Sequence, residues 1–170
     1  VVDFSRHTVS LVAVVSDVFR QGRPVTGFAF NSIGRFAQSG IIRERLIPRI
    51  GAAPAETYIG GDGRISPAAL AKVLMKDEKP GGHGDRASAI AALELAAWDL
   101  LAKLDDQPAA NTIAKAFGRT PADKVCVYAA GGYYYPEGGP DRLREELKAY
   151  QDMGFTQFKM KVGGVPLKED

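Results

Sequence analysis

Two lysines near the carboxyl end of the sequence are the residues best suited to chemistry. Lys159 and Lys161 follow the apolar stretch at 155–158 and lead into the glycines Gly163 and Gly164. Because side chains two residues apart on a strand point to the same face, we expect two ammonium groups side by side where a strand enters a loop. A neighbouring positive charge lowers the pKa of a lysine, which can then act as a base. The alternative is a pair of solvated lysines at an exposed strand end.

The elements expected around these lysines alternate between strand and helix. A continuous apolar run at 125–130 is typical of a strand covered on both faces. A helix is expected at 140–153, where it begins with Pro140 and ends before Gly154. The next strand is expected at 155–162. The order strand, helix, strand predicts the start of a parallel α/β array, with the lysines at the carboxyl end of its second strand.

The sequence before this array begins with a β-hairpin. Strands are expected at 9–18 and 24–31, and Gln21 and Gly22 mark the turn between them. The pattern of elements changes near Pro121. We therefore predict an α+β domain over residues 1–120 and the first elements of a second domain over residues 121–170.

Helices are expected to fill most of the first domain after the hairpin. Ser66 is a helix N-cap followed by proline at the first helical position, Asp85 is expected to cap the longest helix, and Pro48 disturbs the end of another. The segment at 51–64 is expected to be a loop. The longest helix is almost entirely apolar and is predicted to be buried, with Trp98 in the core. The four helices are expected at 35–50, 66–76, 85–104 and 108–117.

Composition excludes several classes of function. The 170 residues are 45% hydrophobic and 25% charged, and the net charge of +2 is too small to indicate nucleic acid or a membrane surface as a partner. No stretch reaches the ~18 apolar residues that a membrane span needs. The single cysteine, Cys126, indicates a reducing compartment, so we predict a cytoplasmic protein. The first residue is not methionine and the last residues resemble a helix start, so we expect a fragment of a longer protein.

Four segments together resemble one family. The helix at 89–103, AIAALELAAWDLLAK, resembles the signature helix of the mandelate racemase/muconate lactonizing group of the enolase superfamily, and Lys159-Met160-Lys161 resembles its Lys-x-Lys motif. The segments at 78–84 and 127–136 are similar to segments of the tartrate dehydratases within that group. The resemblance implies an α+β capping domain over residues 1–120. It also implies the start of a (β/α) TIM-type barrel over residues 121–170, which is incomplete in this chain.

The resemblance also implies a reaction. It indicates a Mg²⁺-dependent dehydratase of a hydroxy diacid or acid sugar, similar to tartrate, in which a β-hydroxyl leaves as water after the α-proton is removed. Lys161 would be the base, and Lys159 would stabilise the developing charge. The Mg²⁺ ligands and the general acid are expected beyond residue 170. A racemase, epimerase or cycloisomerase on the same scaffold is an alternative, as is an inactive fragment that serves only in binding or assembly.

Three further residues are assigned to substrate binding by the same resemblance. Lys79 and Tyr133 would hold the distal end of a small anionic carboxylate, and Asn31 follows the hairpin where capping domains contribute specificity residues. A solvated loop cation is the alternative for Lys79, and a packed or exposed aromatic is the alternative for Tyr133. His83 is predicted to be structural. Ile33 stands where the tartrate dehydratases have asparagine, which argues against tartrate itself. A homo-oligomer is also expected.

Overall fold

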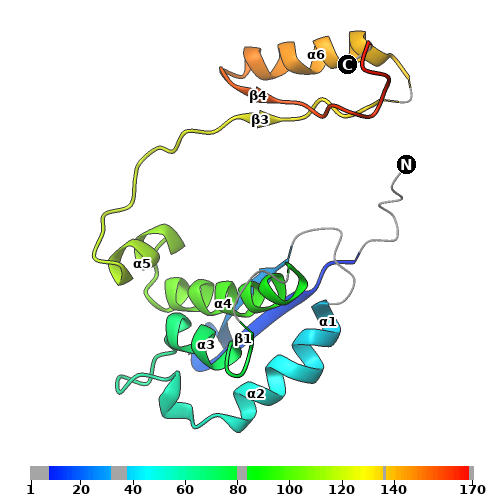
Figure 1. The fold of residues 1–170 in the computed structure, drawn as a ribbon. Helices are drawn as coiled ribbons and strands as arrows, with labels where there is room; N and C mark the ends of the chain where they lie inside the picture. Colours follow the sequence, from blue (N-terminus) through cyan, green and yellow to red (C-terminus); the bar gives the residue numbers. More distant parts are fainter. Residues whose placement is uncertain (1–7, 32–37, 80–83, 136, 169–170) are drawn as a thin grey trace. The chain divides into compact units, whose positions relative to one another are not determined.

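The computed structural model describes residues 8–31, 38–79, 84–135 and 137–168 (Figure 1). These residues form a mixed α/β structure, which divides into two compact units over residues 1–121 and 122–170. No helix in the described ranges is both long enough and apolar enough to cross a membrane.

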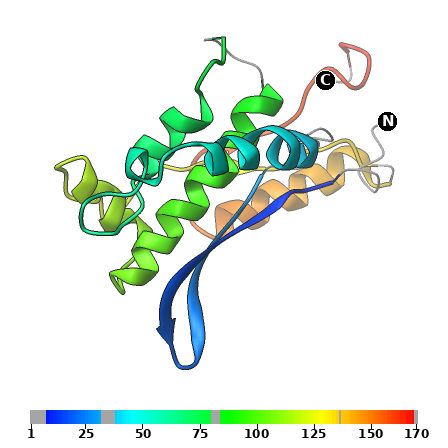
Figure 2. The same ribbon diagram turned by 90° about the horizontal axis from the view of Figure 1, so that it is seen from below.

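The first unit begins with the predicted hairpin. Strands β1 (Leu11–Arg20) and β2 (Arg23–Phe30) pair antiparallel and lie side by side in Figure 2. Gln21 and Gly22 both have positive φ, at 52° and 75°, as a two-residue type I′ turn requires. The hairpin is therefore confirmed, with each strand displaced by one or two residues from its predicted bounds.

Helix α4 (Gly84–Leu104) packs directly on β2. A Cβ on Gly27 would lie 2.5 Å from the backbone nitrogen of Leu100, so only glycine allows this approach. Ala96 and Leu100 are the residues of the helix that lie against Gly27. The predicted buried helix is confirmed, and its fully or nearly fully buried members are Ala89, Ala92, Leu93, Ala96, Ala97, Leu100 and Ala102.

Two charged side chains of α4 bind the open edge of β2. The Asp99 carboxylate accepts a hydrogen bond of 2.7 Å from the backbone N–H of Phe28. The Lys103 Nζ donates to the backbone carbonyl of Thr26 at 3.0 Å. These bonds satisfy backbone groups that an edge strand would otherwise leave unpaired.

The helix predicted at 35–50 is three helical segments. They are α1 (Gln38–Ile41), the π-helix η2 (Ile42–Leu46) and α2 (Ile47–Ala52). Pro48 has no backbone N–H, and in a regular α-helix its ring would clash with the carbonyl of the residue four positions earlier. The wider π turn directly before it, where the Ile47 N–H donates to the Ile42 carbonyl, accommodates this. The proline therefore changes the helix type instead of ending the helix.

The remaining helices of the first unit differ from the prediction at their ends. The segment predicted as a loop at 51–64 contains the last residues of α2 and the 3₁₀ turn η3 (Ala55–Thr57). Helix α3 (Pro67–Leu74) begins as predicted, with the Ser66 hydroxyl accepting the Ala69 N–H. Asp85 lies in the first turn of α4, not at its cap, because the helix already includes Gly84. Helix α5 (Ala109–Ala116) follows Pro108.

The second unit contains a short parallel β-α-β arrangement. Strand β3 (Ala129–Ala130) pairs in parallel with β4 (Phe158–Lys159), and α6 (Gly139–Asp152) connects them. The order and the parallel pairing agree with the prediction, but the predicted strand lengths, 125–130 and 155–162, were wrong. Val125 is 74% exposed, so this stretch is not covered on both faces within the chain described here. No closed barrel exists among the described residues, and the capping-domain and barrel assignments stay predictions.

Candidate functional site

The predicted site residues are distributed over both units. Lys159, Lys161 and Tyr133 belong to residues 122–170, whereas Asn31 and Lys79 belong to residues 1–121.

Tyr133 and Lys161 lie next to each other at the carboxyl end of the parallel strand pair. The Lys161 Nζ is 5.9 Å from the centroid of the Tyr133 ring, which is at the outer limit of a cation–π contact. Tyr133 is 57% exposed, and both lysines are also exposed. Lys159 is the last residue of β4, whereas Lys161 follows the strand. The sequence did not indicate the pairing of Tyr133 with Lys161.

An extra residue in the strand pairing produces this arrangement. The Gly131 N–H donates to the Lys159 carbonyl at 3.0 Å, and the Lys161 N–H donates to the Gly132 carbonyl at 3.0 Å. In a regular parallel ladder a single residue would provide both the donor and the acceptor. The added residue is Gly132, with a φ of +63°, so the backbone makes a β-bulge directly before Tyr133.

Residues 131–135, which include Tyr133, form a segment that we call the aromatic–glycine loop. A carboxylate on α6 binds this loop. Glu146 accepts the Gly132 N–H at 3.0 Å, the Tyr150 hydroxyl at 2.7 Å and the Tyr135 hydroxyl. A Cβ on Gly131 would lie 2.5 Å from the Glu146 Oε1. Sequence reasoning assigned no role to Glu146. The only signal was its i, i+4 spacing from Tyr150 on a predicted helix.

The hydrogen bonds shift the pKa values of all three side chains around this carboxylate. The hydroxyls of Tyr135 and Tyr150 together lower the pKa of Glu146, against the opposing effect of burial. The hydrogen bond to the carboxylate raises the pKa of Tyr135 and that of Tyr150, and burial raises both further. The arrangement therefore favours an ionised glutamate and two protonated phenols at neutral pH. Arg142 also lies 4.5 Å from the Tyr135 ring centroid.

Tyr134 links the same loop to the turn after Lys161. The Gly164 N–H donates to the Tyr134 hydroxyl at 2.6 Å. A Cβ on Gly164 would lie 2.5 Å from the Cζ of that ring, so the ring packs directly on the glycine backbone. Gly163 has a φ of +87°, which a side chain rarely adopts. The glycines after Lys161 thus form a turn that receives Tyr134.

Lys79 lies next to a buried carboxylate surrounded by arginines. The Glu78 side chain is 3% exposed and forms ion pairs with Arg45 at 2.9 Å and with Arg49 and Arg86 at 3.0 Å. Burial raises the pKa of Glu78, but hydrogen bonds from Arg49 and Arg86 and the charge of Arg45 outweigh it, so the pKa is lowered. Sequence reasoning did not predict this cluster because its members are far apart in the chain.

The side chain of Lys79 itself is exposed. Together with Arg45, Arg86 and the two aspartates Asp77 and Asp85, it lines an open hollow of about 490 Å³. Its basic groups are able to bind an anion, although the aspartates oppose this. The substrate-binding role of Lys79 stays a prediction.

Asn31 is 5% exposed and extends the hairpin pairing. Its Oδ1 accepts the Ser10 N–H at 2.9 Å, and its own N–H donates to the Ser10 carbonyl at 3.3 Å. Its Nδ2 is buried and has no hydrogen-bond partner among the described residues. The amide oxygen therefore stabilises the hairpin, and only the amide nitrogen of Asn31 is available for the predicted substrate contact. Ile33 and His83 lie outside the described residues.

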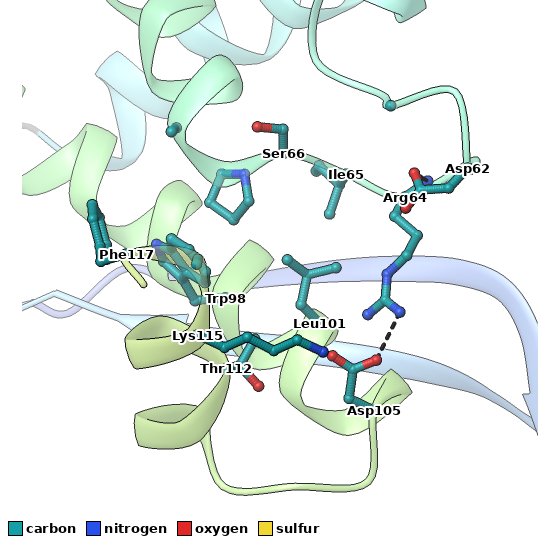
Figure 3. Close-up of a pocket in the computed structure, with 14 residues that line it drawn as sticks. Asp62, Arg64, Ile65, Ser66, Trp98, Leu101, Asp105, Thr112, Lys115 and Phe117 are labelled. Carbon is teal, nitrogen blue, oxygen red and sulfur yellow. Dashed lines mark hydrogen bonds and ion pairs between the residues drawn. The ribbon is translucent and has the colours of Figure 1, made fainter. Parts of the chain in front are cut away.

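A second hollow in the first unit, of about 570 Å³, was not predicted (Figure 3). Trp98 and Phe117 lie on one side of it, with ring centroids 6.3 Å apart. On the other side Arg64 forms an ion pair with Asp105 at 2.7 Å, and its hydrogen bond lowers the pKa of that carboxyl. Trp98 is 9% exposed, so it is a core residue as predicted, with one edge at the hollow.

The described residues contain no group of three or more His, Cys, Asp or Glu side chains that could hold a metal ion. Glu146 and Glu78 are both occupied by protein hydrogen-bond donors. The described residues therefore do not fit a Mg²⁺ site.

Curated proteins similar to this chain include two dehydratases. The chain is 33% identical over 90 residues to an arabinonate dehydratase of Saccharolobus solfataricus, and the aligned segment covers 53% of this chain and 23% of that protein. It is 32% identical over 74 residues to a cis-3-hydroxy-L-proline dehydratase of Roseibium aggregatum, and the aligned segment covers 44% of this chain and 18% of that protein. The matched segments thus span less than a quarter of the length of these relatives. No family model matches the chain.

Proposed function

We propose that this chain belongs to a dehydratase that removes water from a hydroxy carboxylic acid, with an acid sugar or a hydroxy diacid as the substrate. The observation that carries the proposal is the similarity of about half of the chain to relatives that are both named dehydratases. Their named substrates differ, but each is an acid that bears a hydroxyl group. The common step is the loss of water, which favours elimination over racemisation.

The proposed reaction uses Lys161 as the base. The ε-amine in its neutral form accepts the α-proton, and the electrons of the broken Cα–H bond form a double bond between Cα and Cβ. The Cβ–O bond breaks, and a general acid donates a proton to the departing hydroxyl, which leaves as water. Where Cα carries a hydroxyl group, as in a sugar acid, the product is an enol that tautomerises to a 2-keto-3-deoxy acid. Lys159 stabilises the negative charge that develops on the substrate during proton removal.

The position of the lysines supports this assignment. Lys159 and Lys161 are solvent-accessible at the carboxyl end of a parallel strand, where α/β enzymes place their reacting groups. Tyr133 lies against Lys161 and presents a largely exposed phenol on the same side of the loop. We propose that Tyr133 contacts the substrate beside the base.

Magnesium dependence is part of the proposal, with the ligands outside residues 1–170. The described residues supply no group of side chains that could hold the ion. Treatment of the purified protein with EDTA should abolish dehydration, and added Mg²⁺ should restore it.

The activity is tested with a panel of acids. Arabinonate, other sugar acids, tartrate and 3-hydroxyproline are incubated with the purified protein, and keto acids are trapped with semicarbazide. We expect at least one acid to give a keto product that carries one deuterium at Cβ when the reaction is run in D₂O, because tautomerisation of the enol adds a solvent proton there. Inversion at Cα without loss of water would replace the proposal with a racemase or epimerase.

A further inference from the structure

We propose that Glu146 on α6 is a positioning residue that sets the conformation of the aromatic–glycine loop and thereby holds Tyr133 and the backbone of Lys161 in place. The inference rests on the proposed role of Lys161 as the base. It adds a residue on a neighbouring helix that contacts neither lysine directly.

The first argument is where the three hydrogen bonds fall. The Oε2 atom of Glu146 accepts the Gly132 N–H and the Tyr135 hydroxyl, and the Oε1 atom accepts the Tyr150 hydroxyl. Gly132 and Tyr135 flank Tyr133 on its two sides. Both ends of this short segment are therefore fixed to one carboxylate, and the Tyr150 hydroxyl, one turn along the same helix, fixes the carboxylate itself.

The second argument is the short connection from Glu146 to Lys161. The N–H of Gly132 donates to Glu146, and the carbonyl of the same residue accepts the Lys161 N–H at 3.0 Å. One glycine thus joins the helix to the backbone of the proposed base. The two hydrogen bonds act on the peptide groups on either side of the Gly132 Cα, so together they restrain the backbone torsions of this residue, whose φ is +63°.

The third argument is steric. A Cβ on Gly131 would lie 2.5 Å from the Glu146 Oε1, and a Cβ on Gly132 would lie 2.5 Å from the Cβ of Met160. The two glycines leave room for the carboxylate on one side and for the neighbouring strand on the other. The aromatic–glycine loop therefore has glycine at the position that contacts the carboxylate. A glutamate that only covered the surface would not require glycine there.

Charge supports the same conclusion. A carboxylate accepts hydrogen bonds at both oxygens, whereas an amide offers a single acceptor and places two donors at the other atom. Charge-assisted hydrogen bonds are roughly twice as strong as neutral ones. Replacement by alanine removes all three acceptor contacts, and replacement by glutamine keeps part of them.

The test compares Glu146→Ala with Glu145→Ala, a neighbouring substitution at an exposed position of the same helix. Hydrogen–deuterium exchange of the purified proteins is followed in peptides that cover residues 129–135 and 158–164. We expect faster exchange in both peptides for Glu146→Ala and wild-type exchange for Glu145→Ala. Unchanged protection of the 158–164 peptide in Glu146→Ala would overturn the inference, whether or not the protein is a dehydratase.

The kinetic readout separates positioning from general stability. Misplacement of a reacting group by ~1 Å costs on the order of 10²-fold, so kcat and the rate of α-proton exchange should fall by about that factor in Glu146→Ala, with a smaller rise in KM from the displaced Tyr133. Glu146→Gln should recover part of the loss. Wild-type kcat in Glu146→Ala would overturn the inference even if exchange of the loop increased.

Two precautions keep the failure modes apart. If Glu146→Ala does not fold, Glu146→Gln and Tyr135→Phe take its place, and each should show a smaller increase in exchange in the same peptides. If the wild-type protein dehydrates none of the acids, the proposed function fails. The exchange experiment then still decides whether Glu146 holds the loop and the Lys161 backbone.

Discussion

Lys161 is a residue whose surroundings are set by its backbone more than by its side chain. The Lys161 N–H donates to the Gly132 carbonyl. The bulge at Gly132 places the centroid of the Tyr133 ring 5.9 Å from the Lys161 Nζ. The side chain itself is exposed. An accessible amine next to an aromatic hydroxyl is suited to meet an anionic substrate from solvent.

Lys161→Ala should abolish turnover and α-proton exchange with D₂O and leave the fold intact. The side chain is exposed, so its removal costs little packing. NMR measures the exchange, and circular dichroism checks the fold. Lys168→Ala, an exposed lysine of the same unit, is the control and should keep wild-type activity. Exchange at the wild-type rate in Lys161→Ala would exclude Lys161 as the base.

Lys79→Met tests whether the substrate has a second carboxylate. A hydrogen bond between a lysine and a carboxylate contributes about 1.5–3 kcal/mol, or roughly 10- to 100-fold in affinity. We expect kcat/KM for a hydroxy diacid to fall by that factor and kcat/KM for the matched monoacid to change little.

The control for this prediction is Lys76→Met, a nearby exposed lysine that does not line the hollow. It should affect neither substrate. Equal losses for diacid and monoacid in Lys79→Met would show that Lys79 does not distinguish the distal carboxylate. No loss for either substrate would show that Lys79 is a solvated cation beside the Glu78 cluster.

At the scale of elements, the contact between β2 and α4 determines the first unit. Gly27 lets the strand touch the helix backbone, and Asp99 and Lys103 then bind the strand's open edge. The helix thus supplies both the apolar cover and the polar partners of the same strand. The Arg20 side chain also donates to the last carbonyls of α4, those of Lys103 and Leu104, at 2.8 Å.

Gly27→Ala should destabilise the protein through this contact. The added methyl group would overlap the backbone of α4 at Ala96 and Leu100, and overpacking typically costs about 1–3 kcal/mol. Thermal and urea unfolding would measure the loss. Gly40→Ala in α1 is the control, because its Cβ meets no atom within 4 Å, and it should be neutral or slightly stabilising. A Gly27→Ala protein as stable as the wild type would disprove the close approach.

At the scale of the whole molecule, buried charge ties together parts that are far apart in sequence. Glu78 binds Arg45 and Arg49 on the segment from η2 to α2, and Arg86 on α4. Removal of one partner from such a cluster leaves a buried charge uncompensated. It therefore destabilises the fold more than removal of one partner from an exposed ion pair. The first unit therefore depends on the ionised state of one glutamate.

The lowered pKa of Glu78 predicts a specific loss of stability in acid. A carboxyl whose folded pKa is below its unfolded value stabilises the fold above the unfolded value, which is 4.5 for glutamate. That contribution disappears as the pH falls from 4.5 through the folded pKa. Urea unfolding at a series of pH values should show that the stability difference between wild type and Glu78→Gln is largest at neutral pH and shrinks in this window. A difference that is independent of pH would contradict the assignment.

Local signals in the sequence determined the elements that depend on few neighbours. The turn at Gln21 and Gly22 and the Ser66 cap before Pro67 act within a few residues, so the hairpin and α3 were predictable. The apolar composition of 85–104 was enough to predict a buried helix, because burial follows from composition over many turns. The apolar stretch before Lys159 and the glycines after Lys161 predicted a strand end at this place, and β4 does end at Lys159, with Lys161 beyond it.

Only the tertiary structure decided what these elements meet. The lengths of β3 and β4 depend on the strands available for pairing, which a run of apolar residues does not reveal. The bulge at Gly132 and the bonds to Glu146 and Glu78 join residues that are remote in sequence, and no local pattern encodes such partners. The sequence therefore predicted which residues could react, and the long-range hydrogen bonds and close glycine contacts decided how the backbone of one of them, Lys161, is held.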